Sequence, residues 1–80
     1  MKRPAKKWIG RIVRVYWRDP SGFINHDLSD VKLSHCVSIG ELVQFDSVKV
    51  ILRTSKYSGS DVGDYTVLAM GCCTKFELAN

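Results

Sequence analysis

The sequence is poor in several features, and each shortage excludes a class of protein. No apolar run approaches the roughly 20 residues that a membrane-spanning helix needs. The basic start at residues 2–7 is not followed by the apolar core of a secretory signal. We therefore expect a soluble protein that contacts no membrane and is located in the cytoplasm, with the nucleus as the alternative.

Cysteine and metal-ligand patterns are equally sparse. The chain has three cysteines, an odd number, and the adjacent Cys72 and Cys73 would form only a strained bridge. We expect reduced thiols, as in an intracellular protein. His26 and His35 add further zinc-type ligands, but no CxxC or HxxxH spacing organises them. The sequence therefore predicts no bound metal and no cofactor.

Signals of catalysis are missing as well. His26 and Asp27 are neighbours, but nothing pairs them with a nucleophile, and no glycine-rich loop of the phosphate-binding type occurs. We expect that the protein is not an enzyme. Its length allows one domain, expected to be a monomer, with a thin core, because so short a chain buries only about 60% of its unfolded surface.

Acidic residues are absent from the first 18 positions. This stretch carries seven cations, whereas the remaining 62 residues hold five basic and eight acidic side chains, so a local charge of +7 stands beside one of −3. Such asymmetry favours a polyanionic partner that contacts one end of the chain. A solvated basic tail without a specific role is the alternative interpretation. The cations are Lys2, Arg3, Lys6, Lys7, Arg11, Arg14 and Arg18.

Residues 10–24 predict a β-hairpin, and the rest of the interpretation depends on it. Residues 11–17 are rich in β-branched and aromatic types, which suit a half-buried strand. Residues 19–22, Asp-Pro-Ser-Gly, supply turn chemistry, and Phe23 and Ile24 resume the extended pattern. Alternation divides the first strand into two faces, with Val13, Val15 and Trp17 on an apolar face and Ile12, Arg14 and Tyr16 on the other.

The same stretch resembles the start of a cold-shock domain, a small barrel of the OB type. That family opens with Lys-Gly-x-Val-Lys-Trp-Phe-Asn and continues with Lys-Gly-Phe-Gly-Phe-Ile. Aligned without gaps, the family's valine falls on Ile12, and its final Gly-Phe-Ile falls on residues 22–24. Phe23 then occupies a position at which the family stacks bases. The family's tryptophan falls on Arg14 and the first phenylalanine of its second motif on Ser21, so the chain resembles a divergent member that lacks most stacking rings.

Downstream segments predict further strands. Residues 31–34 alternate, with Lys32 outward, and resemble the family's Asp-Val-Phe-Val-His-Phe segment, in which a one-residue insertion would place the family's histidine on His35. Residues 42–52 form the longest β-prone run, and a change of phase near Asp46 predicts a β-bulge within it. Residues 65–70 complete the set. Five β segments without a helical period predict an all-β, five-stranded antiparallel barrel, which the resemblance makes one of the OB type.

The expected barrel spans residues 8–74, after a basic flexible arm at residues 1–7 and before a tail at residues 75–80. Residues 53–64 predict a long flexible loop. In OB-type barrels the loop between strands four and five commonly contacts nucleic acid. Arg53, Lys56 and Tyr57 are the candidate contacts in this loop.

Together these features predict binding of single-stranded nucleic acid, RNA in preference to DNA, with low sequence specificity. Rings would stack on unpaired bases while cations follow the phosphates. The alternative is a protein-interaction module, within a ribonucleoprotein assembly, on a barrel that has lost its stacking rings. The candidate binding residues are Lys6, Lys7, Arg11, Arg14, Tyr16, Phe23, Lys32, His35, Arg53, Lys56 and Tyr57.

Overall fold

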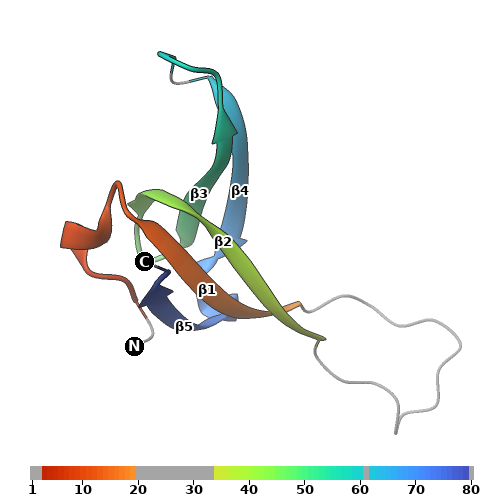
Figure 1. The fold of residues 1–80 in the computed structure, drawn as a ribbon. Helices are drawn as coiled ribbons and strands as arrows, with labels where there is room; N and C mark the ends of the chain where they lie inside the picture. The colour runs from red at the N-terminus through yellow and green to blue at the C-terminus, as the bar shows by residue number, and fades with distance from the viewer. Residues whose placement is uncertain (1–2, 20–33, 61, 80) are drawn as a thin grey trace, which may run out of the picture.

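The protein forms one antiparallel sheet of five strands in a computed structural model, which describes residues 3–19, 34–60 and 62–79. The strands are β1 (Ile12–Asp19), β2 (Ser34–Phe45), β3 (Lys49–Lys56), β4 (Gly63–Ala69) and β5 (Cys73–Leu78). Two short 3-10 helices, η1 (Lys6–Trp8) and η3 (Met70–Cys72), precede β1 and β5. The predicted all-β class is confirmed, since the described residues contain no α-helix (Figure 1).

The strand order in the sheet is β4-β3-β2-β1-β5. β1 to β4 follow one another as a meander, and β5 pairs with the edge of β1 that faces away from β2 (Figure 1). Within the described ranges, no pairing joins the two outermost strands, β4 and β5, so the sheet is not closed into a barrel. The five antiparallel strands are therefore as predicted, whereas closure of the OB type stays a prediction.

β1 shows the alternation that its sequence predicts. Val13 and Val15 are fully buried, and Trp17 packs against the core from the same face. Arg14 and Tyr16 lie on the opposite face, which we call the outer face of the sheet, and are half-buried. The predicted facing of this strand is confirmed, and it fixes which side chains can meet a ligand from solvent.

The inner face of the sheet forms a single apolar core. Among the described residues, no polar or charged residue is buried. Trp8, Trp17, Phe45 and Leu78 pack at the margin of this core. Its buried members are Val13, Val15, Leu42, Val50, Leu52, Leu68, Met70, Cys73 and Phe76.

β2 is the longest strand and joins the two halves of the sheet. It pairs with β1 from Ser34 to Glu41 and with β3 from Glu41 to Phe45. A register shift between Leu42 and Gln44 marks a β-bulge, a feature that bends a strand. Gly40 permits a close approach just before the bulge, because a Cβ atom there would lie 3.0 Å from the backbone oxygen of Arg53.

Residues 42–52 contain a chain reversal, not the single bulged strand that the sequence predicts. Asp46 Oδ1 accepts hydrogen bonds from the backbone N–H of Val48 at 2.7 Å and of Lys49 at 2.9 Å. These bonds close an Asx-type turn between β2 and β3. The change of phase in the sequence is therefore the turn itself, and the bulge lies earlier in β2.

The loop predicted at residues 53–64 is shorter than expected. Residues 53–56 belong to β3 and residues 63–64 to β4, so the connection covers only the positions between them. Gly63 allows the two strands to meet there, because a Cβ atom at this position would lie 1.9 Å from the backbone oxygen of Ser55. The predicted loop is thus largely a β-hairpin.

Both predicted terminal segments contain regular structure. Residues 75–78, expected in a tail, form most of β5, because Phe76 enters the core and Val15 lies opposite it in β1. Residues 6 and 7, expected in the flexible arm, form η1 together with Trp8, the first residue of the expected barrel, and Pro4 before them is buried. The predicted strand start at Phe23 and most of the segment at residues 31–34 lie outside the described residues.

Candidate nucleic-acid interface

Two residues of the predicted binding face meet an acidic side chain from β5. Arg14 lies opposite Glu77 in the register of β1 and β5. Arg14 Nη1 donates a hydrogen bond to Glu77 Oε1, and the Tyr16 hydroxyl donates to the same oxygen at 2.8 Å. Lys75 Nζ lies 3.4 Å from Glu77 Oε2 and 5.1 Å from the centroid of the Tyr16 ring. We call Arg14, Tyr16, Lys75 and Glu77 the Glu77 cluster.

The electrostatics of this cluster are set by its hydrogen bonds. The bond from Tyr16, followed by that from Arg14, lowers the pKa of Glu77 from 4.5 to about 2, although desolvation opposes the change. The same bond to Glu77 raises the pKa of Arg14 above its ordinary value. Two cations and one carboxylate leave the cluster with a net charge of +1, so Arg14 is a partly neutralised cation.

A second arginine of the predicted site is also paired. Arg53 contacts Glu41 through two nitrogens, Nε to Oε1 at 3.3 Å and Nη2 to Oε2 at 3.1 Å. Its guanidinium carbon lies 6.0 Å from the centroid of the Tyr65 ring. The bond to Glu41 raises the pKa of Arg53. Arg53 is therefore a strand residue in a bidentate ion pair, not the loop cation that the sequence predicts.

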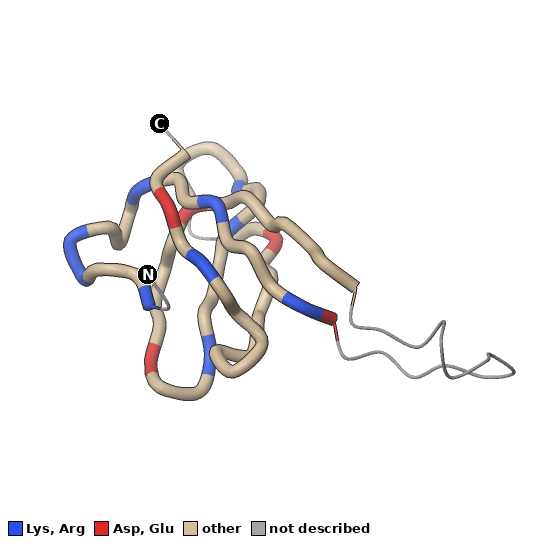
Figure 2. The backbone as a smooth tube through the Cα atoms, turned by 90° about the horizontal axis from the view of Figure 1, so that it is seen from below, with Lys and Arg blue, Asp and Glu red and all other residues tan. Residues whose placement is uncertain are grey.

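Four exposed cations without an acidic partner lie before β1. Arg3, Lys6, Lys7 and Arg11 are exposed, and none of them forms an ion pair with an acidic residue of the described chain. Basic positions follow one another along this stretch without an acidic one between them (Figure 2). We call residues 3–11 the cationic segment.

The cationic segment is held against the sheet by backbone hydrogen bonds. Gly10 N donates to Leu42 O at 2.8 Å, and Leu42 N donates to Arg11 O at 3.0 Å. Within the segment, Trp8 N donates to Ala5 O at 2.9 Å, and the Trp8 side chain packs against the core. The apolar anchor points inward while the cations remain in solvent, which presents positive charge at a defined place on the fold.

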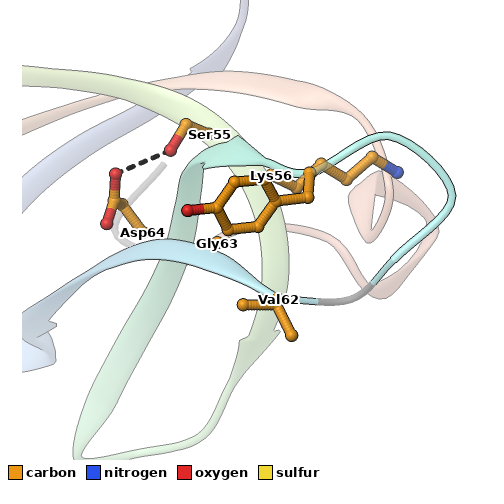
Figure 3. Close-up of a pocket in the computed structure, with 6 residues that line it drawn as sticks. Ser55, Lys56, Val62, Gly63 and Asp64 are labelled. Carbon is orange, nitrogen blue, oxygen red and sulfur yellow. Dashed lines mark hydrogen bonds between the residues drawn. The ribbon is translucent and has the colours of Figure 1, made fainter.

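The hairpin of β3 and β4 carries two further candidate binding residues. Lys56 and Tyr57 are both exposed, and Tyr57 has 72% of its surface accessible. They line a shallow pocket with Ser55, Val62, Gly63 and Asp64. Figure 3 shows Ser55 and Asp64 pointing toward one another, joined by a hydrogen bond of 2.7 Å, while the amine of Lys56 points away from them. The ring and the amine are thus accessible to a ligand.

The structure brings together only part of the predicted site. His35 is exposed near the start of β2, opposite Arg18 of β1. Phe23 and Lys32 lie outside the described residues, so their place relative to the outer face stays a prediction. The sequence prediction omitted Lys75 and Glu77. Their alternation with Phe76 and Leu78 is the period-two signal of a strand and could have placed them on one face.

The cysteines offer little chemistry. Cys73 is buried, and burial, with a smaller contribution from Cys72, raises the pKa of its thiol to about 11. A thiol with this pKa is almost entirely protonated at neutral pH and is a poor nucleophile. Over residues 3–19, 34–60 and 62–79, no group of three or more His, Cys, Asp or Glu side chains is placed to hold a metal ion.

Comparison with models of protein families, with curated proteins and with solved structures finds no match to this chain. The described part of the chain also has no helix with the length and apolar character needed to span a bilayer. A functional assignment must therefore come from the arrangement of its own side chains.

Proposed function

We propose that the protein binds single-stranded nucleic acid through the cationic segment and the neighbouring outer face of the sheet. The observation that carries this proposal is the set of exposed cations before β1, which no described acidic residue compensates. Phosphates of a polyanion gain from such a cluster because bound counterions are released. Lys6, Lys7 and Arg11 contact phosphates in this proposal.

Stacking contributes less than it does in a ring-rich barrel. Tyr57 is the most exposed ring among the candidate residues that the structure describes, and Lys56 beside it adds a cation for a phosphate. One stacked base is worth about 1–3 kcal/mol. Arg14 and Arg53 are secondary contacts, since Glu77 and Glu41 already neutralise them in part. We therefore expect weak, salt-sensitive binding with little preference for sequence.

Salt titration tests the proposal directly. If about four phosphates are neutralised, the logarithm of the binding constant should fall against the logarithm of salt concentration with a slope of about −3. The measurement is fluorescence anisotropy with labelled single-stranded RNA and DNA across a series of salt concentrations. Absence of binding to either strand at low salt rejects the proposal.

A pair of lysine variants locates the contact. Lys7→Gln should make the slope shallower by about 0.7, the value of one phosphate contact on a single strand. Lys49→Gln changes the net charge equally, but Lys49 lies 3.6 Å from Asp46 at the turn between β2 and β3. It should leave the slope unchanged. Equal effects of the two substitutions would show that net charge alone, and not the cationic segment, determines binding.

The finer fold assignment belongs to the same proposal. The resemblance of residues 10–24 to a cold-shock domain supports an OB-type barrel, in which a closed sheet presents its outer face to a strand. Backbone contacts between β4 and β5, measured by nuclear Overhauser effects in solution, would support closure. Their absence would leave an open five-stranded sheet as the binding scaffold.

Exposed aliphatic residues favour a second candidate, a protein-interaction surface. Val37 and Ile39 of β2 lie on the outer face, opposite Tyr16 and Arg14, and are 52% and 54% exposed. Such a surface suits an extended peptide laid across the sheet. Loss of peptide binding in Ile39→Ser, in a protein that binds no nucleic acid at low salt, would favour this second function.

A further inference from the structure

Three donors from two strands converge on one carboxylate in the Glu77 cluster. The Arg14 guanidinium, the Tyr16 hydroxyl and the Lys75 ammonium all reach Glu77 from the outer face of the sheet. The arrangement follows from the strands themselves, because Arg14 and Tyr16 are two residues apart in β1 and face Glu77 and Lys75 in β5. The donors are therefore placed by the sheet register, and any small anion at this position would meet the same three groups.

The cluster is open to solvent, and Arg14 has N–H groups that do not bind Glu77. The side chains of Arg14 and Glu77 are 34% and 31% exposed, and that of Lys75 is 57% exposed. A guanidinium has five N–H donors, of which the bond to Glu77 uses one on Nη1. Carboxylate and phosphate oxygens accept hydrogen bonds from arginine in the same forked geometry. Glu77 thus presents to Arg14 the acceptor atoms that a phosphate would present.

We propose that Arg14, Tyr16 and Lys75 form a subsite for one phosphodiester group of a bound single strand, and that Glu77 occupies this subsite in the free protein. The inference rests on the proposed function. The phosphodiester displaces the Glu77 side chain, or joins it on the outer N–H groups of Arg14, and repulsion by Glu77 keeps the affinity low. The charge of Glu77 then determines how much affinity the subsite adds to that of the cationic segment.

The neighbourhood favours a phosphate over the carboxylate of an acidic peptide. β1 begins directly after Arg11, the last cation of the cationic segment, so Arg14 lies three residues along the chain from that segment. A polynucleotide carries a charge on every residue and can contact both the segment and the subsite.

Glu77→Gln is the decisive variant. Glutamine keeps the size of the side chain and an oxygen that accepts from Arg14 and Tyr16, but it removes the charge that repels a phosphate. For a labelled single-stranded RNA at low salt, we expect affinity to rise about 5- to 10-fold, the scale of one close charge pair near a solvated surface. The salt slope should become steeper by about 0.7 because one more phosphate is neutralised.

A double-mutant cycle separates the subsite from net charge. Arg14→Gln removes the central donor, so adding Glu77→Gln to it should give little of the gain seen in the wild-type background. An equal gain in both backgrounds would mean that the substitution acts through net charge alone and would overturn the subsite. Glu77→Thr, which makes the same charge change with a residue suited to a strand, repeats the test if the glutamine variant does not fold.

The outcomes distinguish the inference from the function on which it rests. If the wild-type protein binds and Glu77→Gln binds no more tightly, the subsite is rejected and nucleic-acid binding stands. If neither protein binds RNA or DNA at low salt, the proposed function itself fails, and the subsite fails with it. Binding that appears only in Glu77→Gln would also reject the proposed function, because the wild-type protein would then bind no single strand at low salt.

Discussion

The charged residues of the outer face are arranged as cross-strand pairs. Arg14 lies opposite Glu77, and Arg53 lies opposite Glu41, each in the register of neighbouring strands. Opposite charges at such positions attract, because their side chains leave the sheet in the same direction. The register is itself imposed by the apolar inner face, since a slip by one residue would expose the core. The ion pairs are therefore a consequence of how the core is packed.

The first prediction concerns the dependence of stability on pH. The pKa of Glu77 is lowered to about 2 in the folded protein, so folding favours its charged form. The resulting stabilisation is fully present above its ordinary pKa of 4.5 and is lost as pH falls through 2. The melting temperature of the wild-type protein should therefore fall between pH 5 and pH 2 by more than that of Glu77→Gln.

The glutamine variant should keep part of the acid sensitivity. Hydrogen bonds from the backbone N–H of Lys49 and Val48 lower the pKa of Asp46 as well, and the substitution leaves that turn intact. If the melting temperatures of the two proteins fall by the same amount between pH 5 and pH 2, the role assigned to the Glu77 cluster is contradicted.

At the scale of single elements, β1 was the most predictable. Its alternation of apolar and polar residues is uninterrupted, and the facing of Val13, Val15, Arg14 and Tyr16 follows from it. The boundary between β2 and β3 was not predictable in the same way. Val48 lies in the turn, although a β-branched residue is typical of a strand. The chain reverses there because a side-chain oxygen of Asp46 accepts two backbone hydrogen bonds.

The pairing of the charged side chains was harder to predict than the strands that carry them. Arg53 and Tyr65 are opposite each other across β3 and β4, but polar residues between them resemble a loop in sequence. The contact of Arg14 with Glu77 joins positions 63 residues apart. The alternation within a strand predicts the face on which each residue lies. The partner of Arg14 follows only from the pairing of β1 with β5, which the sequence does not show.

A substitution in β5 tests whether this segment is a core strand. Phe76→Ala should lower the free energy of unfolding by about 3–5 kcal/mol, because Phe76 is 3% exposed and its loss leaves a cavity in the core. Urea unfolding, followed by circular dichroism, measures the change. Val67→Ala is the control, since Val67 is 60% exposed and should change stability by less than about 0.5 kcal/mol. Equal, small effects of the two substitutions would show that Phe76 contributes little to the core, as expected of a tail.

The whole molecule separates its charge from its core. The cationic segment lies on one side of the sheet, attached by Trp8 and by the hydrogen bonds between residues 10–11 and Leu42 (Figure 2). On the outer face of the described sheet, Glu41 and Glu77 instead pair with Arg53 and Arg14. Under the proposed function, such a distribution would direct a polyanion to the cationic segment.

Removal of residues 2–7 should affect both binding and stability. The deletion removes four cations, among them Lys6 and Lys7 but not Arg11, so the salt slope should become shallower without reaching zero. It also removes the buried Pro4 and the hydrogen bonds to the oxygens of Ala5 and Lys6, each worth about 1 kcal/mol. The melting temperature should fall by about 4–8 °C for each kcal/mol lost.

A full-length control separates these two effects. Glutamine at all four basic positions of residues 2–7 should make the salt slope shallower by as much as the deletion does while preserving the melting temperature, because Pro4 and the backbone are kept. A deletion that leaves the melting temperature unchanged would show that the buried contact contributes little to folding.

The bent strand β2 has a consequence for how the protein opens. It pairs with β1 along its first part and with β3 along its last, and Glu41, where the two parts meet, has a partner on each side. Water can reach its amide protons only after one neighbouring strand has separated. In deuterated solvent, the amides near Glu41, with those of residues 13–17 in β1 and 50–53 in β3, should exchange last and report global unfolding. The amides of β4 and β5, which have a strand on one side only, exchange through local fraying.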